Sequence, residues 1–485
     1  MRDVEMGSDE KQDFISELPN EVLTFILSKL RVDEAVRCNI LAKRWLGLWK
    51  KAPHIEFNGK HMIRPVTQLL HSRESTITQD PFLYPFMKGG VFRYGFVIFQ
   101  LMFRHSGNLS SCRFLHFKKS LWIGEVDTWI KFLVNKMNGL KHLSLECLPD
   151  YGEDADEIMF ENEIYKLCIS HKKFHCLSSL DLINYTMDSW CAFEDCHNLK
   201  ILKLERIHLD DFVLSGILQN CVALENFSLI ESTGFTKLII VNSNLKILRL
   251  QALCVCHLEV IAQNLEVLFL DSITCPVKNL SIYAPSLSNF ESHSYSISSI
   301  EERTFVMKSY DIIAYFIDLS MKQSCNILPK LSAMSLDLDL NNLEEIMYLS
   351  SALGLCTSLQ ILDITLPILS YQIQLQCFTL EKINIEKFVF QEYDYNDFTL
   401  PFLKPTLFWE MRLCKTITQK LKFVTIRGFK GKEKEVEFAK FLITRATMMK
   451  RINIICYDSI EVAENLLSLP RASHNLTINL KCNFN

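Results

Sequence analysis

Three stretches of this chain share one pattern: LKILKL at residues 199–204, LKILRL at 245–250 and LEVLFL at 265–270. Each stretch has an apolar residue at a first position, here called n, and again at n+3 and n+5. Because successive side chains of a β-strand point to opposite faces, the residues at n+3 and n+5 lie on the same side of a strand. Each stretch therefore predicts a short strand with one buried face.

The pattern recurs between residues 140 and 385. Its starting leucines are Leu140, Leu177, Leu199, Leu224, Leu245, Leu265, Leu287, Leu331, Leu359 and Leu380. Most neighbouring starts are 20–28 residues apart, and one interval of 44 predicts a degenerate repeat near residues 305–318. A strand at this period is typical of a solenoid, in which stacking buries what one repeat cannot bury alone. The predicted fold class is α/β: a solenoid of irregular repeats with parallel strands on its concave face.

The pattern resembles the leucine-rich repeat, and the resemblance covers residues 140–405. Several repeats have a small residue at n−3, including Cys196, Cys221 and Cys356, which we interpret as buried packing residues. Asparagine or serine at n−1 tolerates turn geometry. The asparagine or cysteine that the family carries at n+8 is mostly replaced here by an apolar residue, so the usual asparagine ladder is not expected.

Residues at n+2, n+4 and n+6 are expected on the concave face, where solenoids bind partners. The acidic ones are Glu146, Asp181, Glu205, Asp271, Glu291, Asp337, Asp363 and Glu386, and the basic ones are Lys203, Arg249 and Lys382. This excess of acid disfavours nucleic acid and favours a neutral or basic partner; simple solvation of the acids is the alternative interpretation. Phe269 is a candidate aromatic anchor unless a loop covers it. The candidate target-binding residues are Asp181, Lys203, Glu205, Arg249, Phe269, Asp271 and Glu291.

Ahead of the repeats, residues 13–50 predict a small helical module. Ser16 is a candidate helix cap, Pro19 suits a first helical turn, and residues 22–30 carry apolar side chains at helical spacing. Three short helices in about 40 residues are too small to bury Trp45, Trp49 and the many aliphatic side chains alone. The module is therefore expected to share its apolar surface with another protein, or alternatively to pack on the rest of its own chain.

The order and spacing of LPNEVLTFILSKL at residues 18–30 and AVRCNILAKRWLGLW at residues 35–49 resemble the plant type of F-box. Ala42 departs from that subfamily, which commonly has serine there. The resemblance implies binding of a Skp-type adaptor and, through it, a cullin. The residues it implies for adaptor binding and packing, without separating the two roles, are Leu18, Pro19, Val22, Leu23, Ile26, Leu27 and Leu30.

Residues 421–456 predict a strand, a turn, a helix and a second strand, which resemble the FBD region found after leucine-rich repeats in many plant F-box proteins. This unit is expected to cap the open end of the solenoid. Between the module and the repeats, a strand ending at Phe117 and a helix at Glu125–Met137 are expected. The predicted domains are a disordered N-terminus at 1–12, the F-box at 13–58, a connector with an irregular first repeat at 59–139, the repeats at 140–405 and the FBD-like cap at 406–485.

The composition and the apolar segments of the chain disfavour several classes of protein. The 485 residues carry 52 Lys and Arg against 56 Asp and Glu, a net charge of −4, which argues against a dedicated nucleic-acid binder. No apolar secretory segment begins the chain, so the 17 cysteines are expected to be reduced thiols. The apolar run Tyr94–Phe103 is too short to span a membrane and predicts a buried strand or core helix. The expected compartment is the nucleus or cytoplasm, which the sequence does not distinguish.

No catalytic motif is found, and no cofactor is expected. Possible zinc ligands, Cys168, His171, His175, Cys176, Cys191, Cys196 and His197, include no Cys-x-x-Cys pair, which disfavours a metal site. The sequence therefore predicts a non-catalytic subunit of a ubiquitin ligase that holds a target protein on its repeats. Two other functions stay open: a receptor in which a small ligand completes the target site, and a scaffold that acts without a ligase.

Overall fold

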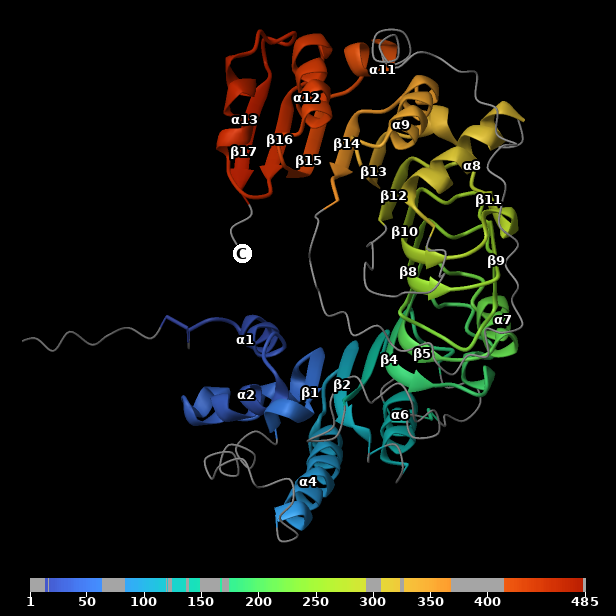
Figure 1. Cartoon of the computed structure of the whole chain (residues 1–485). Coiled ribbons are helices and arrows are strands. Elements are labelled where there is room, and N and C mark those ends of the chain that lie inside the picture. The colour runs from blue at the N-terminus through green and yellow to red at the C-terminus, as the bar shows by residue number, and fades with distance from the viewer. Residues whose placement is uncertain are drawn as a thin grey trace, which may run out of the picture. The chain divides into compact units, whose positions relative to one another are not determined.

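The computed structural model describes residues 14–15, 17–62, 83–118, 120, 124–136, 139–148, 166–167, 174–293, 307–322, 327–367 and 414–482. The chain divides into two compact units: unit 1 is Met1–Leu199 and unit 2 is Lys200–Asn485. Each unit contains a parallel β-sheet, as the repeat pattern predicts (Figure 1).

Unit 1 begins with short helices and continues into its sheet. Its helices are α1 (Asn20–Leu27), α2 (Val32–Arg37), α4 (Leu83–Arg104) and α6 (Glu125–Lys136), with 3-10 turns η1 (Cys38–Ile40), η2 (Lys43–Trp45), η3 (Leu48–Lys51) and η6 (Cys191–Phe193). Its strands are β1 (His54–Asn58), β2 (Ser111–Phe117), β3 (His142–Leu148) and β4 (Ser179–Thr186), which pair in that order. The strand ending at Phe117 and the helix at Glu125–Met137 are thereby confirmed as β2 and α6.

An aromatic cluster joins the sheet of unit 1 to helices α4 and α6. The rings of Phe57 on β1 and Phe114 on β2 stack with centroids 5.0 Å apart, and Phe114 stacks on Trp129 of α6 at 5.4 Å. The hydroxyl of Tyr94 on α4 donates a hydrogen bond to the carbonyl of Leu115 at 2.7 Å. Buried aromatic pairs stabilise a core beyond the area they bury. Residues 54–58, which were assigned from the sequence to the end of the F-box without a predicted strand, therefore form the first strand of the sheet.

The apolar run Tyr94–Phe103 is helical, as one of its two interpretations required, but it is buried on one side only. Tyr94, Ile98 and Met102 are buried, while Phe96 and Phe103 are exposed. Among the residues that the structure describes, no helix combines the length and apolar character needed to cross a membrane.

Unit 2 contains one large sheet, one small sheet and several helices. The large sheet contains, in spatial order, β5 (Ile201–His208), β6 (Asn226–Ile230), β8 (Ile247–Cys254), β10 (Val267–Thr274), β12 (Asn289–His293), β13 (Ala333–Asp337), β14 (Ile361–Thr365), β15 (Phe423–Phe429), β16 (Arg451–Cys456) and β17 (Thr477–Cys482). The small sheet pairs β7 (Lys237–Val241), β9 (His257–Ile261) and β11 (Leu280–Tyr283). The helices are α7 (Asp211–Asn220), α8 (Ser309–Met321), α9 (Leu343–Leu355), α11 (Cys414–Gln419), α12 (Glu433–Arg445) and α13 (Glu461–Glu464), with 3-10 turns η7 (Val277–Asn279), η8 (Leu328–Lys330) and η11 (Asn465–Ser468).

The predicted repeats of unit 2 are confirmed by burial. The residues at n, n+3 and n+5 are buried in each repeat that starts at Leu199, Leu224, Leu245, Leu265, Leu331 and Leu359. Helices and the small sheet cover one face of the large sheet, while the opposite face, here called the strand face, carries none of them (Figure 1). The strand face is therefore the side on which unit 2 presents n+2, n+4 and n+6.

Two expectations about the repeats change. The degenerate repeat expected near residues 305–318 is helix α8, and β12 pairs directly with β13. The FBD-like region does more than cap the sheet: β15 pairs with β14, and β16 and β17 continue in parallel. The predicted repeat at Leu380, Ile383 and Ile385 lies outside the described residues.

An asparagine ladder does exist, although not at n+8. The amide of Asn244, at n−1, donates to the carbonyl of Val222 in the preceding repeat at 3.1 Å, and that of Asn264 donates to Ser243 at 2.8 Å. Each bond satisfies a turn carbonyl and joins neighbouring repeats. The n−1 positions, interpreted from sequence only as turn formers, therefore also stabilise the stack.

A left-handed backbone recurs at n+7. The φ angle is 49° at Arg206, 48° at Glu231, 50° at Ala252 and 52° at Ser272 in unit 2, and 64° at Asn184 in unit 1. None of these residues is glycine, which adopts this conformation most easily. The repetition shows that every one of these strands bends at the same point.

Candidate interaction site

The helical module of unit 1 buries both of its tryptophans. Trp45 is 6% exposed and Trp49 is 4% exposed. Helix α1 packs against η3, and α2 packs against η3 and β1. For the two tryptophans the second interpretation therefore holds: the module buries them with help from strand β1 of its own chain.

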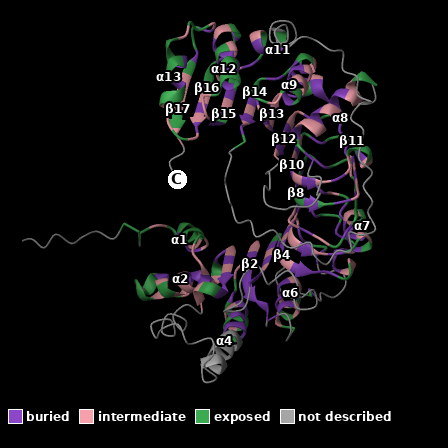
Figure 2. Ribbon diagram, viewed as in Figure 1, coloured by how far each residue is buried: buried purple, intermediate pink, exposed green. Residues whose placement is uncertain are grey.

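The same module nevertheless leaves other large apolar side chains exposed (Figure 2). Ile40, the last residue of η1, is 87% exposed, and Leu46, which follows η2, is 71% exposed. Among the described residues of this module, the exposed large apolar ones are Phe14, Ile15, Val22, Phe25, Ile26, Ile40, Leu41 and Leu46. A gathering of exposed apolar side chains on one small module marks an interaction site.

The structure separates the two roles that the sequence left together. Leu23 and Leu27 belong to the core of the module, whereas Pro19, Val22 and Ile26 are exposed. Leu18 and Leu30 are half-buried. The exposed residues that the sequence did not single out are Phe14, Ile15, Phe25, Ile40, Leu41 and Leu46. Phe25 lies within α1 but outside the apolar pattern used for that helix, and the other five lie outside regular α-helix, where no helical period applies.

Hydrogen bonds join the start of α1 to turn η2. The guanidinium of Arg44 in η2 donates to the carbonyl of Leu18 and lies 3.5 Å from the side-chain oxygen of Asn20. The amide of Gly47, whose φ of 77° suits glycine, donates to Asn39 at 2.8 Å. These bonds hold the exposed apolar side chains of α1 and of the turns on one rigid module.

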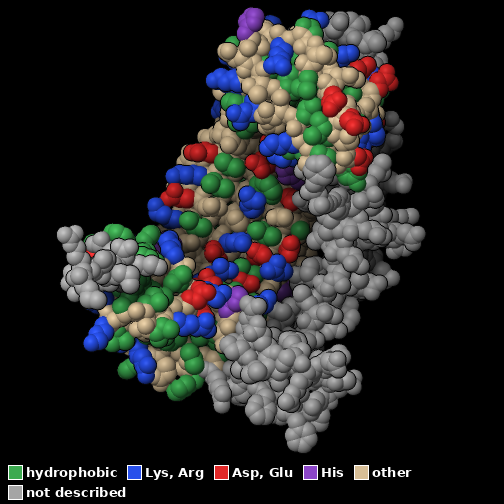
Figure 3. All heavy atoms as spheres, turned by 90° about the vertical axis from the view of Figure 1, so that its left-hand side faces the viewer, with side chains coloured by type: hydrophobic (Ala, Val, Ile, Leu, Met, Phe, Trp, Pro, Cys, Tyr) green, Lys and Arg blue, Asp and Glu red, His purple; other side chains and the backbone are tan. Residues whose placement is uncertain are grey.

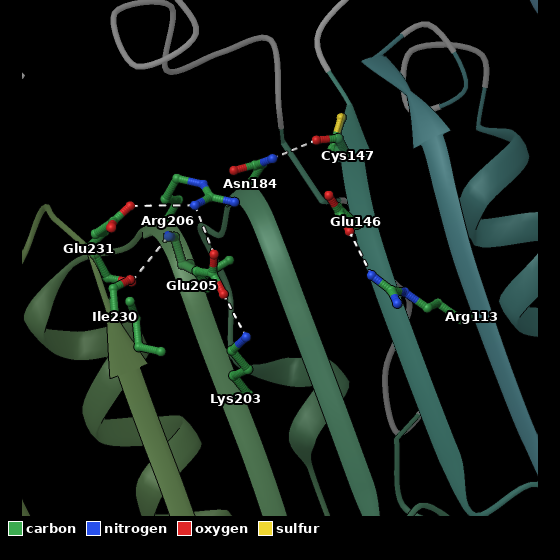
Figure 4. Close-up of polar contacts among 11 residues, drawn as sticks. Arg113, Glu146, Cys147, Asn184, Lys203, Glu205, Arg206, Ile230 and Glu231 are labelled. Atoms are coloured by element: carbon green, nitrogen blue, oxygen red, sulfur yellow. Dashed lines mark hydrogen bonds and ion pairs between the residues drawn. The ribbon is translucent and has the colours of Figure 1, made fainter. Parts of the chain in front are cut away.

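In unit 1, the strand face carries an ion pair across neighbouring strands. The guanidinium of Arg113 on β2 lies 3.2 Å from the carboxylate of Glu146 on β3 (Figure 4). Asp181 on β4 is half-buried and lies beside Ser144 of β3 in the parallel register. Asp181 is therefore on the predicted face, but it belongs to unit 1, whereas the other candidate target-binding residues belong to unit 2.

In unit 2, a row of four charges crosses β5 and the start of the turn after β6 (Figure 4). The ammonium of Lys203 lies 2.6 Å from Glu205, and the guanidinium of Arg206 lies 2.8 Å from Glu205 and 3.4 Å from Glu231. Arg206 and Glu231 occupy n+7 and reach the strand face because of the left-handed bend described above. They were missed because strict alternation assigns n+7 to the buried side.

A second cluster surrounds Phe269 on β10. The guanidinium carbon of Arg249 on β8 lies 4.1 Å from the centre of the Phe269 ring, and the imidazole of His293 on β12 lies 5.9 Å from it. Parallel pairing sets this arrangement, because Arg249, Phe269 and Glu291 are register partners. Phe269 is therefore half-covered by an arginine, an arrangement that stabilises the cation over the ring.

Carboxylates surround His293. Its Nδ1 lies 2.8 Å from Oδ1 of Asp337 on β13. Burial lowers the pKa of His293, but the hydrogen bond and charge of Asp337, together with the charges of Asp271 and Glu291, outweigh burial and raise it. Asp271 is itself buried, which raises its pKa despite a hydrogen bond from Ser272. Of the candidate target-binding residues, Asp271 is therefore a poor contact for a partner.

The strand face of unit 2 is mixed in charge rather than acidic (Figure 3). Its described acids at n+2, n+4 and n+6 are Glu205, Asp271, Glu291, Asp337 and Asp363, and its bases are Lys203, Arg249, Arg427, Arg451 and Lys481. Three of those bases lie on β15–β17, which the sequence assigned to a separate cap. Glu386 and Lys382 lie outside the described residues.

A groove of about 440 Å³ follows the amino-terminal ends of β5, β6, β8 and β10. Alternating charges at n+1 line it: Lys200, Glu225, Lys246 and Glu266. Glu225 bridges Lys200 at 2.7 Å and Lys246 at 2.8 Å, and these hydrogen bonds lower the pKa of Glu225 to about 2. The charged side chains that line this groove are therefore largely neutralised by ion pairs with one another.

No group of three or more possible metal ligands occurs among the residues that the structure describes. Cys168 and His171, two of the candidate zinc ligands, lie outside them. Cys196, Cys221 and Cys356 are buried, as expected of packing residues. Burial raises the pKa of Cys356 to about 12, so its thiol is protonated at neutral pH and unsuited to nucleophilic chemistry.

Comparisons with known proteins match the C-terminal region to a family model and large parts of the chain to curated plant proteins. Residues 413–454, which contain α11, β15 and α12, match the FBD family model. A protein of Arabidopsis thaliana named as an F-box protein is 28% identical over 364 residues, which are 71% of this chain and 68% of the relative. A second, an F-box/FBD/LRR-repeat protein of the same plant, is 26% identical over 222 residues, 45% of this chain and 44% of the relative. The chain thus spans roughly half to two thirds of the curated relatives it matches.

Proposed function

Because this chain belongs to the plant family of F-box proteins with leucine-rich repeats and an FBD region, whose members are generally non-catalytic adaptor subunits, we propose that it recognises substrates for a Skp–cullin–F-box ubiquitin ligase. In this proposal the helical module binds a Skp-type adaptor, and through it a cullin. The strand face of the repeats holds the target protein. Such a subunit acts in the nucleus or cytoplasm.

The observation that carries the proposal is the exposed apolar surface of the module. Its core is already complete, since Leu23, Leu27, Trp45 and Trp49 are buried. The apolar side chains on α1 and around the 3-10 turns therefore keep exposed surface that is available to a partner. Removing apolar surface from water on both partners is a main driving force for association.

The target-binding role rests on the strand face of unit 2. Charged and aromatic groups there are held by contacts within and between strands, including Lys203 with Glu205 on β5 and Arg249 on β8 with Phe269 on β10. Preorganised groups bind with a smaller loss of side-chain freedom than flexible ones. The chain supplies proximity: it holds the target close to the subunit that transfers ubiquitin, so that a bimolecular step becomes effectively intramolecular.

Adaptor capture by the purified chain tests this proposal. Val22→Asp with Ile26→Asp places two charges on the exposed side of α1 and should weaken binding at least about tenfold, because two buried apolar contacts are lost and two charges are desolvated. Phe212→Asp on α7 is the matched control, because Phe212 is an exposed apolar residue of a helix in unit 2. It should bind normally.

Calorimetric titration with a Skp-type adaptor provides the measurement. If the wild-type chain binds no adaptor at saturating concentration, the ligase proposal fails and a ligase-independent scaffold remains. If the Phe212 control loses binding as strongly as the α1 variant, the module is not the binding site.

A further inference from the structure

Acid and base are separated along the strand face of unit 2. All five carboxylates at n+2, n+4 and n+6 lie on strands β5–β14. Strands β15, β16 and β17 carry none at these positions and instead carry Arg427, Arg451 and Lys481. The last three strands therefore form a cationic end to a face that is otherwise mixed.

The acids of the same region lie away from the strand face. Residues 414–482 contain 13 Lys and Arg but only six Asp and Glu. The six acids are Glu433, Glu435, Glu437, Asp458, Glu461 and Glu464. Five of them lie on α12 and α13, which cover the opposite face of the sheet (Figure 1), and Asp458 lies in the turn after β16. They leave the cations of the strand face uncompensated.

The three cations are exposed and available. Arg427, Arg451 and Lys481 are each classed among the exposed residues, and none forms an ion pair within the described part of the chain. Phe423 is the register partner of Arg451 and is 38% exposed, so an open aromatic side chain and a guanidinium project from neighbouring backbone positions on the strand face. This combination of unpaired cations and an open ring differs from the Arg249 and Phe269 pair, in which the guanidinium lies over the ring.

The spacing of the cations suits an extended acidic peptide. Arg427 and Lys481 share one row across β15 and β17, so their backbones lie two strand spacings apart, roughly 10 Å. Arg451 lies at the start of β16, roughly four residues or 13 Å along the strands from that row. Acidic residues three or four positions apart in an extended segment span about the same distances.

We propose that the strand face of β15–β17 is a docking surface for an acidic, extended segment of the target protein. The proposal rests on the proposed function and deepens it, because it assigns target recognition to the FBD-like region as well as to the leucine-rich repeats. Arginine suits this role, since its planar guanidinium binds a carboxylate through two parallel hydrogen bonds. The exposed ring of Phe423 adds a contact for an apolar residue of the same segment.

A nucleic acid fits this surface less well than an acidic peptide. Phosphates follow one another at every nucleotide, and their binding commonly uses many cations in a continuous path. Strands β15–β17 carry only three of the strand-face cations, and Asp337 and Asp363 on β13 and β14 would repel a continuing polyanion. A peptide with a few separated acids avoids that repulsion.

The test compares two charge reversals of equal size in the full chain. The first replaces Arg427, Arg451 and Lys481 by Glu, and the second replaces Lys415, Lys420 and Lys440, exposed cations on and beside α11 and α12. The probe is a fluorescein-labelled 12-residue peptide of repeated Glu-Gly-Gly, with a Lys-Gly-Gly peptide and a 12-nucleotide single-stranded DNA for comparison. Fluorescence anisotropy gives each dissociation constant at low and high salt.

The wild-type chain should bind the Glu peptide, and the strand-face variant should bind it about tenfold more weakly, as expected for three exposed ion pairs. The helix-side variant should bind it within about twofold of wild type, and high salt should reduce all binding because the Debye length shortens. Equal losses in both variants, no binding by the wild type, or tighter binding of DNA with the same dependence on the three cations would overturn the proposal.

Adaptor capture is measured on the same proteins and separates the two proposals. Both variants should retain it, because the helical module is unchanged, and its loss in the strand-face variant alone would signal misfolding and overturn the docking assignment. A wild-type chain that captures no adaptor but shows the expected peptide selectivity would end the ligase proposal while supporting the docking surface.

Discussion

The left-handed backbone at position n+7 allows us to predict how Ala252→Gly changes the stability of unit 2. This residue has a φ of 50° and an exposed side chain, so Ala252→Gly removes backbone strain and very little buried surface. A left-handed conformation costs an L-residue about 1–2 kcal/mol. Glycine costs about 0.4–1 kcal/mol more than alanine on folding, because an unfolded chain with glycine has more conformational freedom to lose. The net expectation is a stabilisation of about 0.5–1 kcal/mol.

Ala333→Gly is the matched control. Ala333 lies at n+2 on the regular strand β13, where the same chemical change should destabilise by about 0.5–1 kcal/mol. Urea unfolding followed by circular dichroism should therefore separate the two variants by about 1–2 kcal/mol at unchanged m value. If both substitutions destabilise unit 2 equally, the left-handed backbone at n+7 is not a site of strain and the reasoning is refuted.

Three further outcomes follow from burial and charge. Replacing Leu18 and Pro19 by Ala should abolish adaptor binding in calorimetry without changing the urea midpoint of unit 2; unchanged binding would contradict the proposed role of α1. Leu204→Ala in the buried row should cost about 2–5 kcal/mol in urea unfolding, and a loss below about 1 kcal/mol would contradict its close packing. Burial lowers the pKa of His116 from 6.5 to about 4. As the pH falls between these two values, His116 therefore takes up a proton in the unfolded state but stays neutral in the folded state. Unit 1 should lose up to about 3 kcal/mol over that range, and His116→Gln should remove this dependence in urea titrations at several pH values.

The repeat core was predictable because its signal is local. Leu199, Leu202 and Leu204 are buried by the period of a strand alone, so six residues of sequence suffice. The same holds for Leu23 and Leu27 on α1, although sequence could not separate them from exposed Val22 and Ile26. That separation depends on which side of α1 meets η3, a tertiary contact.

The features that the sequence did not predict depend on residues that are distant in the chain, or on left-handed backbone conformations that no glycine marks. Trp49 is buried in η3, which is joined to residues more than 50 positions later: the backbone carbonyl of Lys50 accepts hydrogen bonds from the amides of Ser106 and Gly107, both at 2.9 Å. Arg206 and Glu231 reach the strand face through left-handed bends that no glycine announces. Phe269 is covered because the register brings Arg249 beside it, and register between repeats follows from stacking rather than from either strand.

Hydrogen exchange of the full chain with and without a Skp-type adaptor tests the central claim most directly. The claim is that one exposed apolar face of the helical module meets the adaptor while the strand face stays free for a target. Adaptor should slow exchange at residues 18–46 and leave β5–β17 unchanged. Protection that appears instead on β5–β17, or no protection anywhere at saturating adaptor, would contradict it.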